Sequence, residues 1–205
     1  MLKDLYLKEF LDKTESNEPV PGGGSIAALS SAISAALSAM VANLTVGKKN
    51  YEEVSEEMTE IASKMSAFKS EFVDLIDKDA NSFDKVMKAY KLPKETDEEK
   101  TERSRQIQEG MKYAASVPLE VAQKTSELFG MIEELVKKGN QNAQTDALVA
   151  AMMARTAILS ALYNVKINLG SIKDEVFVQD ITSKVKALET LATSKEAHIL
   201  GLSDL

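Results

Sequence analysis

Apolar residues recur at every third or fourth position over most of the chain, a spacing typical of amphipathic helices. Patterns of this kind cover residues 2–11, 51–90, 97–138 and 175–200. No stretch shows the strict alternation of apolar and polar residues that marks a half-buried strand. The sequence therefore predicts an all-α protein, folded as a single domain over residues 1–205.

Two further stretches, residues 26–46 and 147–169, are apolar on nearly every side and rich in small residues. Helices of this composition are too apolar to face water, and their small side chains let neighbouring backbones approach closely. We therefore predict a bundle of about six to seven helices with two central small-residue helices, which belong in the core or in a subunit interface. The first stretch is also long enough to cross a membrane, but its many Ala and Ser residues and its acidic surroundings favour a buried helix.

Capping residues and a proline predict where several helices begin and end. Thr96 and Glu99 have the spacing of a capping box, which predicts a helix from about residue 97. Pro118 predicts a kink in that helix or its division into two, and Gly139 predicts its end. Ser25 is expected to be the N-cap of the first small-residue helix.

That helix is preceded by a loop of two prolines, three glycines and a serine: Pro19, Val20, Pro21, Gly22, Gly23, Gly24 and Ser25. Proline fixes φ and glycine permits φ > 0, so this segment can hold an unusual, defined loop. The free N–H groups and the dipole of the helix favour an anion, and the glycines expose backbone amides to a flat or charged group. The alternative interpretation is an ordinary turn with a good cap.

Composition and charge exclude several classes of function. The net charge of −7, with a pI near 5.0, leaves no basic field that would attract nucleic acid or an anionic membrane. The absence of cysteine excludes disulfides, thiolate metal sites and cysteine nucleophiles. It is also consistent with a reducing cytoplasm, which is the predicted location. Residues 1–10 alternate in charge and do not resemble a signal peptide.

Few side chains are suited to metal binding or proton transfer. His198 is the only histidine and lies in a charged helix, so we expect it at the surface. No HExxH, CxxC or EF-hand pattern occurs, and no metal site is predicted. Any proton transfer therefore falls to carboxylates, lysines or tyrosines.

Asp79 differs from the other acids of its helix because it falls in the apolar stripe, between Ile76 and Phe83. An acid on an apolar face is expected to have a raised pKa, and such a carboxyl suits general acid–base catalysis at cellular pH. The alternative is a structural aspartate that bonds a neighbouring helix terminus. Asp74, Asp77 and Asp84 lie off the stripe and are expected to be ordinary solvated charges.

Polar residues inside the second small-residue helix each have a structural interpretation. Asp146, the only acid between residues 139 and 169, complements the dipole in the first helical turn. Arg155 suits either a buried ion pair or the carboxylate of a ligand. Asn164 and Asn168 lie four positions apart on one helix face, either as mutual partners or as ligand contacts.

The end of the first small-residue helix carries three further candidates. We expect Asn43 to act much as the two asparagines of the other helix do. Lys48 and Lys49 form a solvated cap that complements the helix dipole, or they bind an anionic tail.

Several short blocks occur together along the chain: Pro21 to Ser25 (PGGGS), residues 41–49 (VANLTVGKK), residues 77–80 (DKDA) with Phe83, residues 89–93 (AYKLP), Gly139 and Asn140 with Asp146, and residues 164–169 (NVKINL). This set resembles the cyclodeaminase/cyclohydrolase family. The family includes the C-terminal half of formiminotransferase-cyclodeaminase and the stand-alone bacterial methenyltetrahydrofolate cyclohydrolases. The resemblance covers nearly the whole chain, and the stand-alone form is expected because no transferase half is present.

The resemblance implies an all-α homodimer that binds folate in a cleft at or near the subunit interface, with no cofactor beyond the tetrahydrofolate substrate. It implies closure of 5-formimidoyltetrahydrofolate to 5,10-methenyltetrahydrofolate with loss of ammonia. Some relatives instead hydrate the methenyl bridge to 10-formyltetrahydrofolate. Both reactions pass through a tetrahedral carbon between N5 and N10. No residue visibly decides between them, and the preference for polyglutamylated substrate is equally open.

The resemblance also implies roles for the candidate residues. Asp79 would take a proton from N10 and give one to the departing amine, or would activate water in the hydrolytic reaction. Asp146 would stabilise positive charge. The loop from Pro21 to Ser25 would bind substrate, with the backbone of Gly22, Gly23 and Gly24 orienting the pterin ring. The remaining substrate-binding candidates are Asn164 and Asn168 for the pterin's amide edge, Asn43, and Lys48, Lys49 or Arg155 for the glutamate tail.

A non-catalytic dimeric scaffold is the alternative of another class. An acidic helical bundle with two small-residue helices suits such a protein. The discriminating features are the loop and the acid, because a scaffold needs neither three glycines beside a cap nor Asp79 on an apolar face.

Overall fold

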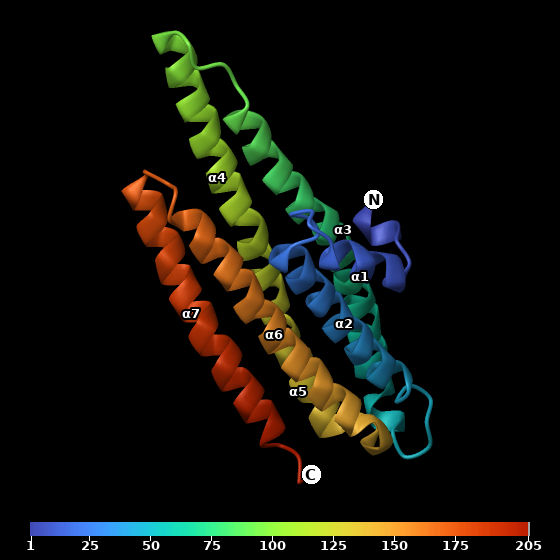
Figure 1. Ribbon diagram of the computed structural model, residues 1–205. Coiled ribbons are helices and arrows are strands. Elements are labelled where there is room, and N and C mark those ends of the chain that lie inside the picture. The colour runs from blue at the N-terminus through green and yellow to red at the C-terminus, as the bar shows by residue number, and fades with distance from the viewer. Residues whose placement is uncertain (205) are drawn as a thin grey trace.

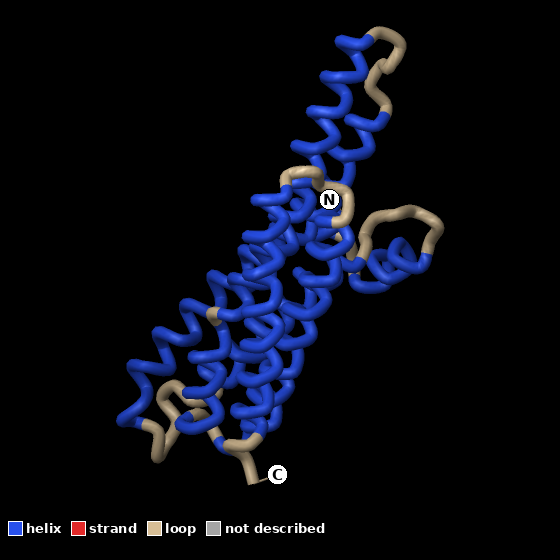
Figure 2. Tube along the Cα trace, turned by 90° about the vertical axis from the view of Figure 1, so that its left-hand side faces the viewer, coloured by secondary structure: helices blue, strands red, loops and turns tan. Residues whose placement is uncertain are grey.

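The structure, a computed structural model, describes residues 1–204 and consists of helices joined by turns (Figure 1, Figure 2). No strand occurs within that range, which confirms the all-α prediction. Its α-helices are α1 (Leu7–Glu15), α2 (Gly23–Asn43), α3 (Ser55–Tyr90), α4 (Asp97–Ser126), α5 (Leu128–Lys138), α6 (Gln144–Leu169) and α7 (Glu175–Leu200). Short 3-10 turns at Leu2–Asp4, Glu52–Val54 and Gln141–Ala143 precede α1, α3 and α6.

Helices α2 and α6 lie side by side and antiparallel in the middle of the bundle (Figure 1). Their backbones approach closely enough for the Ser34 hydroxyl to donate to the carbonyl oxygen of Ala150, at 2.8 Å. Ala28, Ala154 and Ala161 are fully buried. Because α3, α4 and α7 pack around this pair, the predicted arrangement of two central small-residue helices is confirmed.

By length and composition alone, α2 and the stretch from Gln141 to Leu169 could each cross a membrane. In the folded chain, 67% of the most apolar window of α2 is buried inside the bundle. Packing in the core of the bundle therefore accounts for the apolar character of this helix.

Helix α4 continues through Pro118, so of the two alternatives predicted for this residue, a kink or a division, the division is wrong. The break before α5 falls at Glu127. Proline lacks the N–H that would donate to the carbonyl four residues earlier. That carbonyl belongs to Ala114, and it accepts a hydrogen bond from the side-chain nitrogen of Asn168 at 2.9 Å. A donor from α6 thus replaces the missing backbone donor, and α4 needs no break.

The last turns of α3 and the first turns of α4 form a hairpin that reaches beyond α2, α6 and α7 (Figure 1, Figure 2). Thr96 and Glu99 form the predicted capping box at its tip, where the Thr96 side chain accepts from the Glu99 N–H at 3.2 Å. The two helices approach closely at Gly110, where an added Cβ would lie 3.4 Å from the Val86 side chain. The hairpin overhangs the end of the bundle at which α2 begins and α6 ends.

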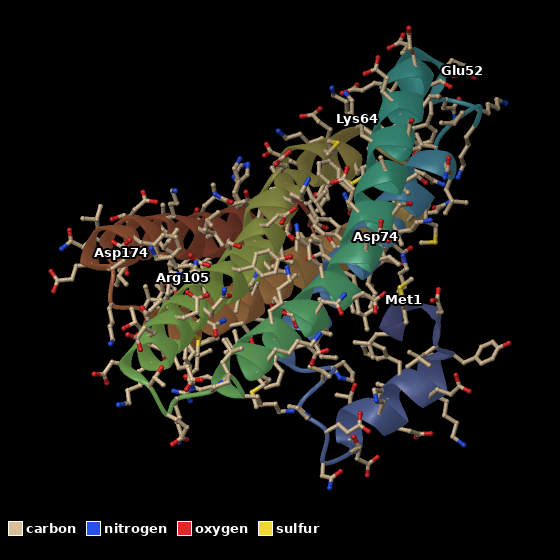
Figure 3. The ribbon with its side chains drawn as sticks, turned by 90° about the horizontal axis from the view of Figure 1, so that it is seen from above. Met1, Glu52, Lys64, Asp74, Arg105 and Asp174 are labelled. Carbon is tan, nitrogen blue, oxygen red and sulfur yellow. The ribbon has the colours of Figure 1, made fainter. Side chains whose placement is uncertain are left out.

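The N-terminal residues pack against α3, and Figure 3 shows Met1 near Asp74. Lys3 forms an ion pair with Asp74 at 2.6 Å, and Asp77 accepts a hydrogen bond from the backbone N–H of Leu2 at 2.7 Å. The expectation that Asp77 is an ordinary solvated charge is therefore wrong, because the turn at Leu2–Asp4 partly covers it.

Candidate functional site

A cavity of about 320 Å³ lies at the start of α2, beneath the overhanging hairpin. The loop before α2 and helices α3, α4 and α6 form its walls. Its polar side chains are those of Asp79, Ser82, Asn164 and Asn168. Its apolar walls include Phe83, Val86 and Met111. A larger cavity of about 540 Å³ lies between the opposite faces of α3 and α4, but none of the predicted site residues lines it.

Asp79 points its carboxyl group at the first turn of α2. Its Oδ2 accepts a hydrogen bond from the Ser25 hydroxyl at 3.0 Å. Burial raises the pKa of Asp79 above the ordinary value of 3.8, while hydrogen bonds from the Ser25 side chain and backbone partly oppose that rise. The carboxyl thus contacts a helix terminus, as the structural interpretation expects, and has the raised pKa expected of an acid in an apolar stripe, while its catalytic role stays a prediction.

The close approach of Asp79 explains the glycine at position 24. A Cβ on Gly24 would lie 2.1 Å from Asp79 Oδ1, a distance at which the carboxyl group would have to move. The predicted N-cap at Ser25 is wrong, since Gly22 is the N-cap and Ser25 lies in the first turn. A carboxyl group from α3 occupies the end of α2, so the hydroxyl of Ser25 faces Asp79 Oδ2 and the Ile76 carbonyl of α3, at 3.0 and 3.1 Å, and does not bond to the turn of its own helix.

Asn164 and Asn168 face the same cavity from the last turns of α6. Asn164 donates to the Ser160 carbonyl at 2.9 Å, and Asn168 donates to the carbonyls of Ala114 and Asn164, both at 2.9 Å. These bonds use the side-chain nitrogens and fix the orientation of both amides. Among the described residues no donor reaches either Oδ1, so each oxygen remains an acceptor for a ligand.

The glycine loop lies directly against one of these amides. A Cβ on Gly23 would lie 3.0 Å from Asn164 Nδ2, tighter than ordinary packing allows. Gly22 and Gly23 also line the cavity. Backbone, amide oxygens and a carboxyl group thus converge on one space, with apolar side chains around them.

The structure places four other candidates at the opposite end of the bundle. Asn43 ends α2, and Lys48 and Lys49 follow it, about 30 Å from Gly23 at 1.5 Å per helical residue. Asp146 lies in the first turn of α6, about 27 Å from Asn164 on the same measure. Within one chain these residues do not join the cavity, and their assigned roles stay predictions.

Arg155 lies midway along α6 with its side chain 41% exposed, so the predicted ion pair is not a fully buried one and a role toward a ligand stays a prediction. Its Nε is 3.4 Å from Glu196 Oε2 on α7. His198 is exposed, as expected, and lies 3.2 Å from Glu133 Oε1. Among residues 1–204, no group of three or more His, Asp or Glu side chains is placed to hold a metal ion.

Sequence reasoning missed the link between Pro118 and Asn168, and it missed Met111 and Ile167 as cavity residues. The proline carried a usable signal. A proline inside a continuous helix leaves one carbonyl free, which calls for an external donor. Met111 and Ile167 carried no such signal, because apolar residues at helical spacing give the same sequence pattern whether they line a cavity or pack in the core.

Comparisons with known proteins show the family to which the chain belongs. A family model described as formiminotransferase-cyclodeaminase matches residues 6–187. A methenyltetrahydrofolate cyclohydrolase of Methylorubrum extorquens is 40% identical over 185 residues, covering 90% of this chain and 88% of that protein. Formimidoyltransferase-cyclodeaminase of Rattus norvegicus is 34% identical over 200 residues, covering 98% of this chain, which spans 37% of the rat protein.

The fold matches as well. The crystal structure of formiminotetrahydrofolate cyclodeaminase from Thermotoga maritima has a TM-score of 0.88 and 34% identity, covering 98% of this chain and 97% of that one. The residues matched by the family model include the glycine loop, Asp79 and both cavity asparagines. The chain belongs to the formiminotransferase-cyclodeaminase family.

Proposed function

We propose that this chain closes 5-formimidoyltetrahydrofolate to 5,10-methenyltetrahydrofolate with loss of ammonia, in the cavity at the start of α2. The observation that carries the proposal is Asp79, a partly buried carboxyl with a raised pKa, set against the backbone of Gly24 in a cavity with free amide acceptors. The similarity to named cyclodeaminases over nearly the whole chain supports it.

Asp79 has the properties that this reaction requires of one group. The N10 nitrogen attacks the formimidoyl carbon, and the new N10–C bond gives a tetrahedral carbon. N10 then loses its proton, and the amine must gain one before its C–N bond breaks and ammonia leaves. The formimidoyl nitrogen enters protonated, so attack by N10 leaves a neutral amine on the tetrahedral carbon. A carboxylate with a raised pKa accepts the N10 proton and returns it to that amine, and the positive charge remains on the methenyl bridge when ammonia leaves.

The other cavity groups suit a pterin ring. Its edge carries N–H donors, and the Oδ1 atoms of Asn164 and Asn168 are acceptors held in place by the bonds of their nitrogens. The glycine backbone lets a flat ring approach without meeting side chains. Phe83 and Val86 supply the apolar surroundings in which the charge on Asp79 is poorly solvated.

Cyclohydrolase activity is the second candidate, and the 40% identity to a methenyltetrahydrofolate cyclohydrolase of similar length favours it. In that reaction water adds to the bridging carbon and Asp79 takes a proton from the water. Asp79 then gives this proton to N5 as the bond from that carbon to N5 breaks, and the remaining hydroxyl proton is released to solvent to leave 10-formyltetrahydrofolate. Both reactions use the same tetrahedral carbon, so the same residues serve either.

We further propose a cytoplasmic homodimer that binds a tetrahydrofolate derivative and neither nucleic acid nor membrane. Apolar side chains remain more than a third exposed along α2 and α6 and at the C-cap of α2, namely Ile33, Met40, Leu44, Val149 and Met152. Ile167 continues the α6 stripe, is 75% exposed, and also lines the cavity. A second copy on this face would therefore border the cavity. Met152→Glu is expected to give a monomer in sedimentation equilibrium, and an intact dimer would contradict this interface.

The assay for the proposed reaction follows the near-ultraviolet absorbance of the methenyl chromophore with each substrate separately. Chromophore formed from 5-formimidoyltetrahydrofolate, with ammonia released, supports the cyclodeaminase. Accelerated loss of chromophore from methenyltetrahydrofolate, with no activity on the formimidoyl compound, supports the cyclohydrolase instead. No activity on either, with no thermal shift by reduced folate, would favour the non-catalytic scaffold.

A further inference from the structure

The outer part of α3 carries an exposed apolar stripe that begins at the cavity. Phe83, Met87 and Tyr90 follow Asp79 at spacings of three and four, which places them on one face of the helix. These three side chains are 37%, 40% and 43% exposed, respectively. From Asp79 to Tyr90 the stripe rises about 16 Å along the hairpin.

Arg103, on α4, lies at the outer end of this stripe. Its Nε and Nη2 donate to the Tyr90 carbonyl at 3.3 and 3.1 Å, and its guanidinium lies 5.7 Å from the centre of the Tyr90 ring. No carboxylate among the described residues pairs with it. Arg105, which Figure 3 labels on the same helix, instead pairs with Glu102 and Glu109, both at 2.6 Å.

Arg103 is therefore a fixed cation with unused donors. A guanidinium has five N–H donors and binds carboxylates through two parallel hydrogen bonds. The bonds to the Tyr90 carbonyl hold it in place, and its Nη1 makes no bond to any described residue. Arginine held in this way beside an aromatic ring is well suited to receive an anionic group from solution.

We propose that the stripe of Phe83, Met87 and Tyr90 holds the p-aminobenzoyl arm of the substrate and that Arg103 binds its glutamyl carboxylate. The inference rests on the proposed function, in which Asp79 exchanges a proton with N10. The arm is attached to N10, so it leaves the cavity beside Asp79, where the stripe begins. The stripe offers an apolar surface for the ring and ends at a cation for the carboxylate.

Within one chain, the cations proposed from the sequence for the glutamate tail are less suited to bind it than Arg103 is. Arg155 has Glu196 at 3.4 Å and lies about 13 Å from Asn164 along α6, away from the cavity. Lys48 and Lys49 lie beyond the far end of α2, about 30 Å from the glycine loop. The arm of a substrate seated at Asp79 reaches Arg103 along a continuous apolar path, whereas α2 itself separates it from the two lysines.

The test compares two ligands that differ only in the glutamyl group, 5-formyltetrahydrofolate and 5-formyltetrahydropteroate, by isothermal titration. Arg103→Gln is expected to weaken binding of the first about tenfold, as loss of a charge-assisted pair does, and to leave binding of the second unchanged. Arg105→Gln is the matched control, two positions away and already paired, and is expected to change neither affinity.

A second pair of variants tests the path of the arm. Met87→Glu and Met87→Lys place opposite charges at the same exposed position between the cavity and Arg103. The glutamate variant is expected to weaken 5-formyltetrahydrofolate severalfold by repulsion of the carboxylate, whereas the lysine variant keeps or improves the wild-type affinity. Equal effects of the two substitutions on this ligand would overturn the proposed path.

The remaining outcomes separate this proposal from the proposed function. If wild-type protein binds both ligands equally, or if Arg103→Gln weakens both alike, the glutamyl contact is wrong while the cavity assignment survives. If Met87→Glu splits a dimer, the stripe is a subunit contact and the proposal is wrong. If wild-type protein binds neither ligand, the proposed function fails and this proposal fails with it.

Discussion

The two ends of the α2–α6 pair both carry asparagines near helix termini, but they differ in how far their polar groups are satisfied. At the end where α2 finishes, Asn140 donates from its backbone to Thr45 Oγ1 at 2.9 Å and from its side chain to the Leu44 carbonyl at 3.0 Å. Its Oδ1 accepts from the Asn142 N–H at 3.1 Å. Both the nitrogen and the oxygen of the Asn140 side chain therefore have partners within the chain.

At the end where α2 begins, the asparagines leave acceptors unused. Asn164 and Asn168 spend their nitrogens on backbone carbonyls and keep their Oδ1 atoms free within the described chain. Asp79 lies beside them, and burial raises its pKa. Packing alone requires neither free acceptors nor a poorly solvated acid. The saturated network holds the fold, and the unsaturated one is suited to bind and react.

The largest expected effect comes from Asp79→Asn, which removes the proton carrier while keeping the size of the side chain. Turnover is expected to fall about 1,000-fold, within the range for loss of a general acid–base group. Helical content and oligomeric state are expected to stay unchanged. Asp84→Asn, on the same helix but exposed, is the matched control in the chromophore assay. Near-normal turnover of Asp79→Asn would remove Asp79 from the mechanism.

Gly24→Ala tests the same end of the bundle without replacing a titratable residue. The new Cβ would meet Asp79 Oδ1 at 2.1 Å, so the carboxyl is displaced and turnover is expected to fall about 100-fold, as misplacement of a reacting group by about an ångström does. Gly130→Ala, where an added Cβ meets nothing within 4 Å, is the control and is expected to keep full activity. If Gly24→Ala and Gly130→Ala are equally active, the close approach of Gly24 and Asp79 does not matter for turnover.

A pair of asparagine variants tests the contrast between the two ends directly. Asn140→Ala breaks the saturated network and is expected to lower the free energy of unfolding by about 2 kcal/mol, because buried partners lose their bonds, with unchanged KM. Asn164→Ala is expected to raise KM severalfold, with a smaller loss of stability. Urea denaturation gives the free energy of unfolding of each variant, and steady-state kinetics gives its KM. A raised KM for Asn140→Ala together with a larger loss of stability for Asn164→Ala would contradict the roles assigned to the two ends.

The smallest expected effect is on stability as a function of pH. The pKa of Asp79 is raised in the folded protein, so the folded state binds the proton more tightly than the unfolded state. This stabilisation is present below the unfolded pKa and is lost as pH rises through the folded pKa. Asp79→Asn resembles the protonated form, and its Tm is expected to exceed that of wild type at neutral pH. The difference in Tm between the variant and wild type should shrink as the pH falls toward 3.8. A difference in Tm that does not change with pH would contradict the raised pKa of Asp79.

Much of the fold could be predicted because its signals are local. The spacing of apolar residues in α3 and the capping box at Thr96 and Glu99 depend only on near neighbours. Asp79 could be singled out for the same reason, since an acid in an apolar stripe is visible in a single helix. The predicted N-cap at Ser25 and the predicted division of the helix at Pro118 are wrong. In each case a side chain distant in sequence, Asp79 or Asn168, supplies a hydrogen-bond partner that the local sequence does not show.

The division of the candidate residues between the two ends could not be predicted. It follows from the antiparallel packing of α2 against α6, which brings the start of one to the end of the other (Figure 1). Asp146 and Asn164 belong to one helix, and their positions in the sequence do not show which of them meets the glycine loop. Only the packing direction shows that Asn164 meets the loop and that Asp146 does not.

The most direct test of this account is the position of bound folate in a crystal of the protein grown with 5-formyltetrahydrofolate. The account predicts ligand density between the glycine loop and Asn164, with N10 beside the Asp79 carboxyl. Density confined to the opposite end of the bundle, around Lys48 and Asp146 and away from Gly24, would contradict it.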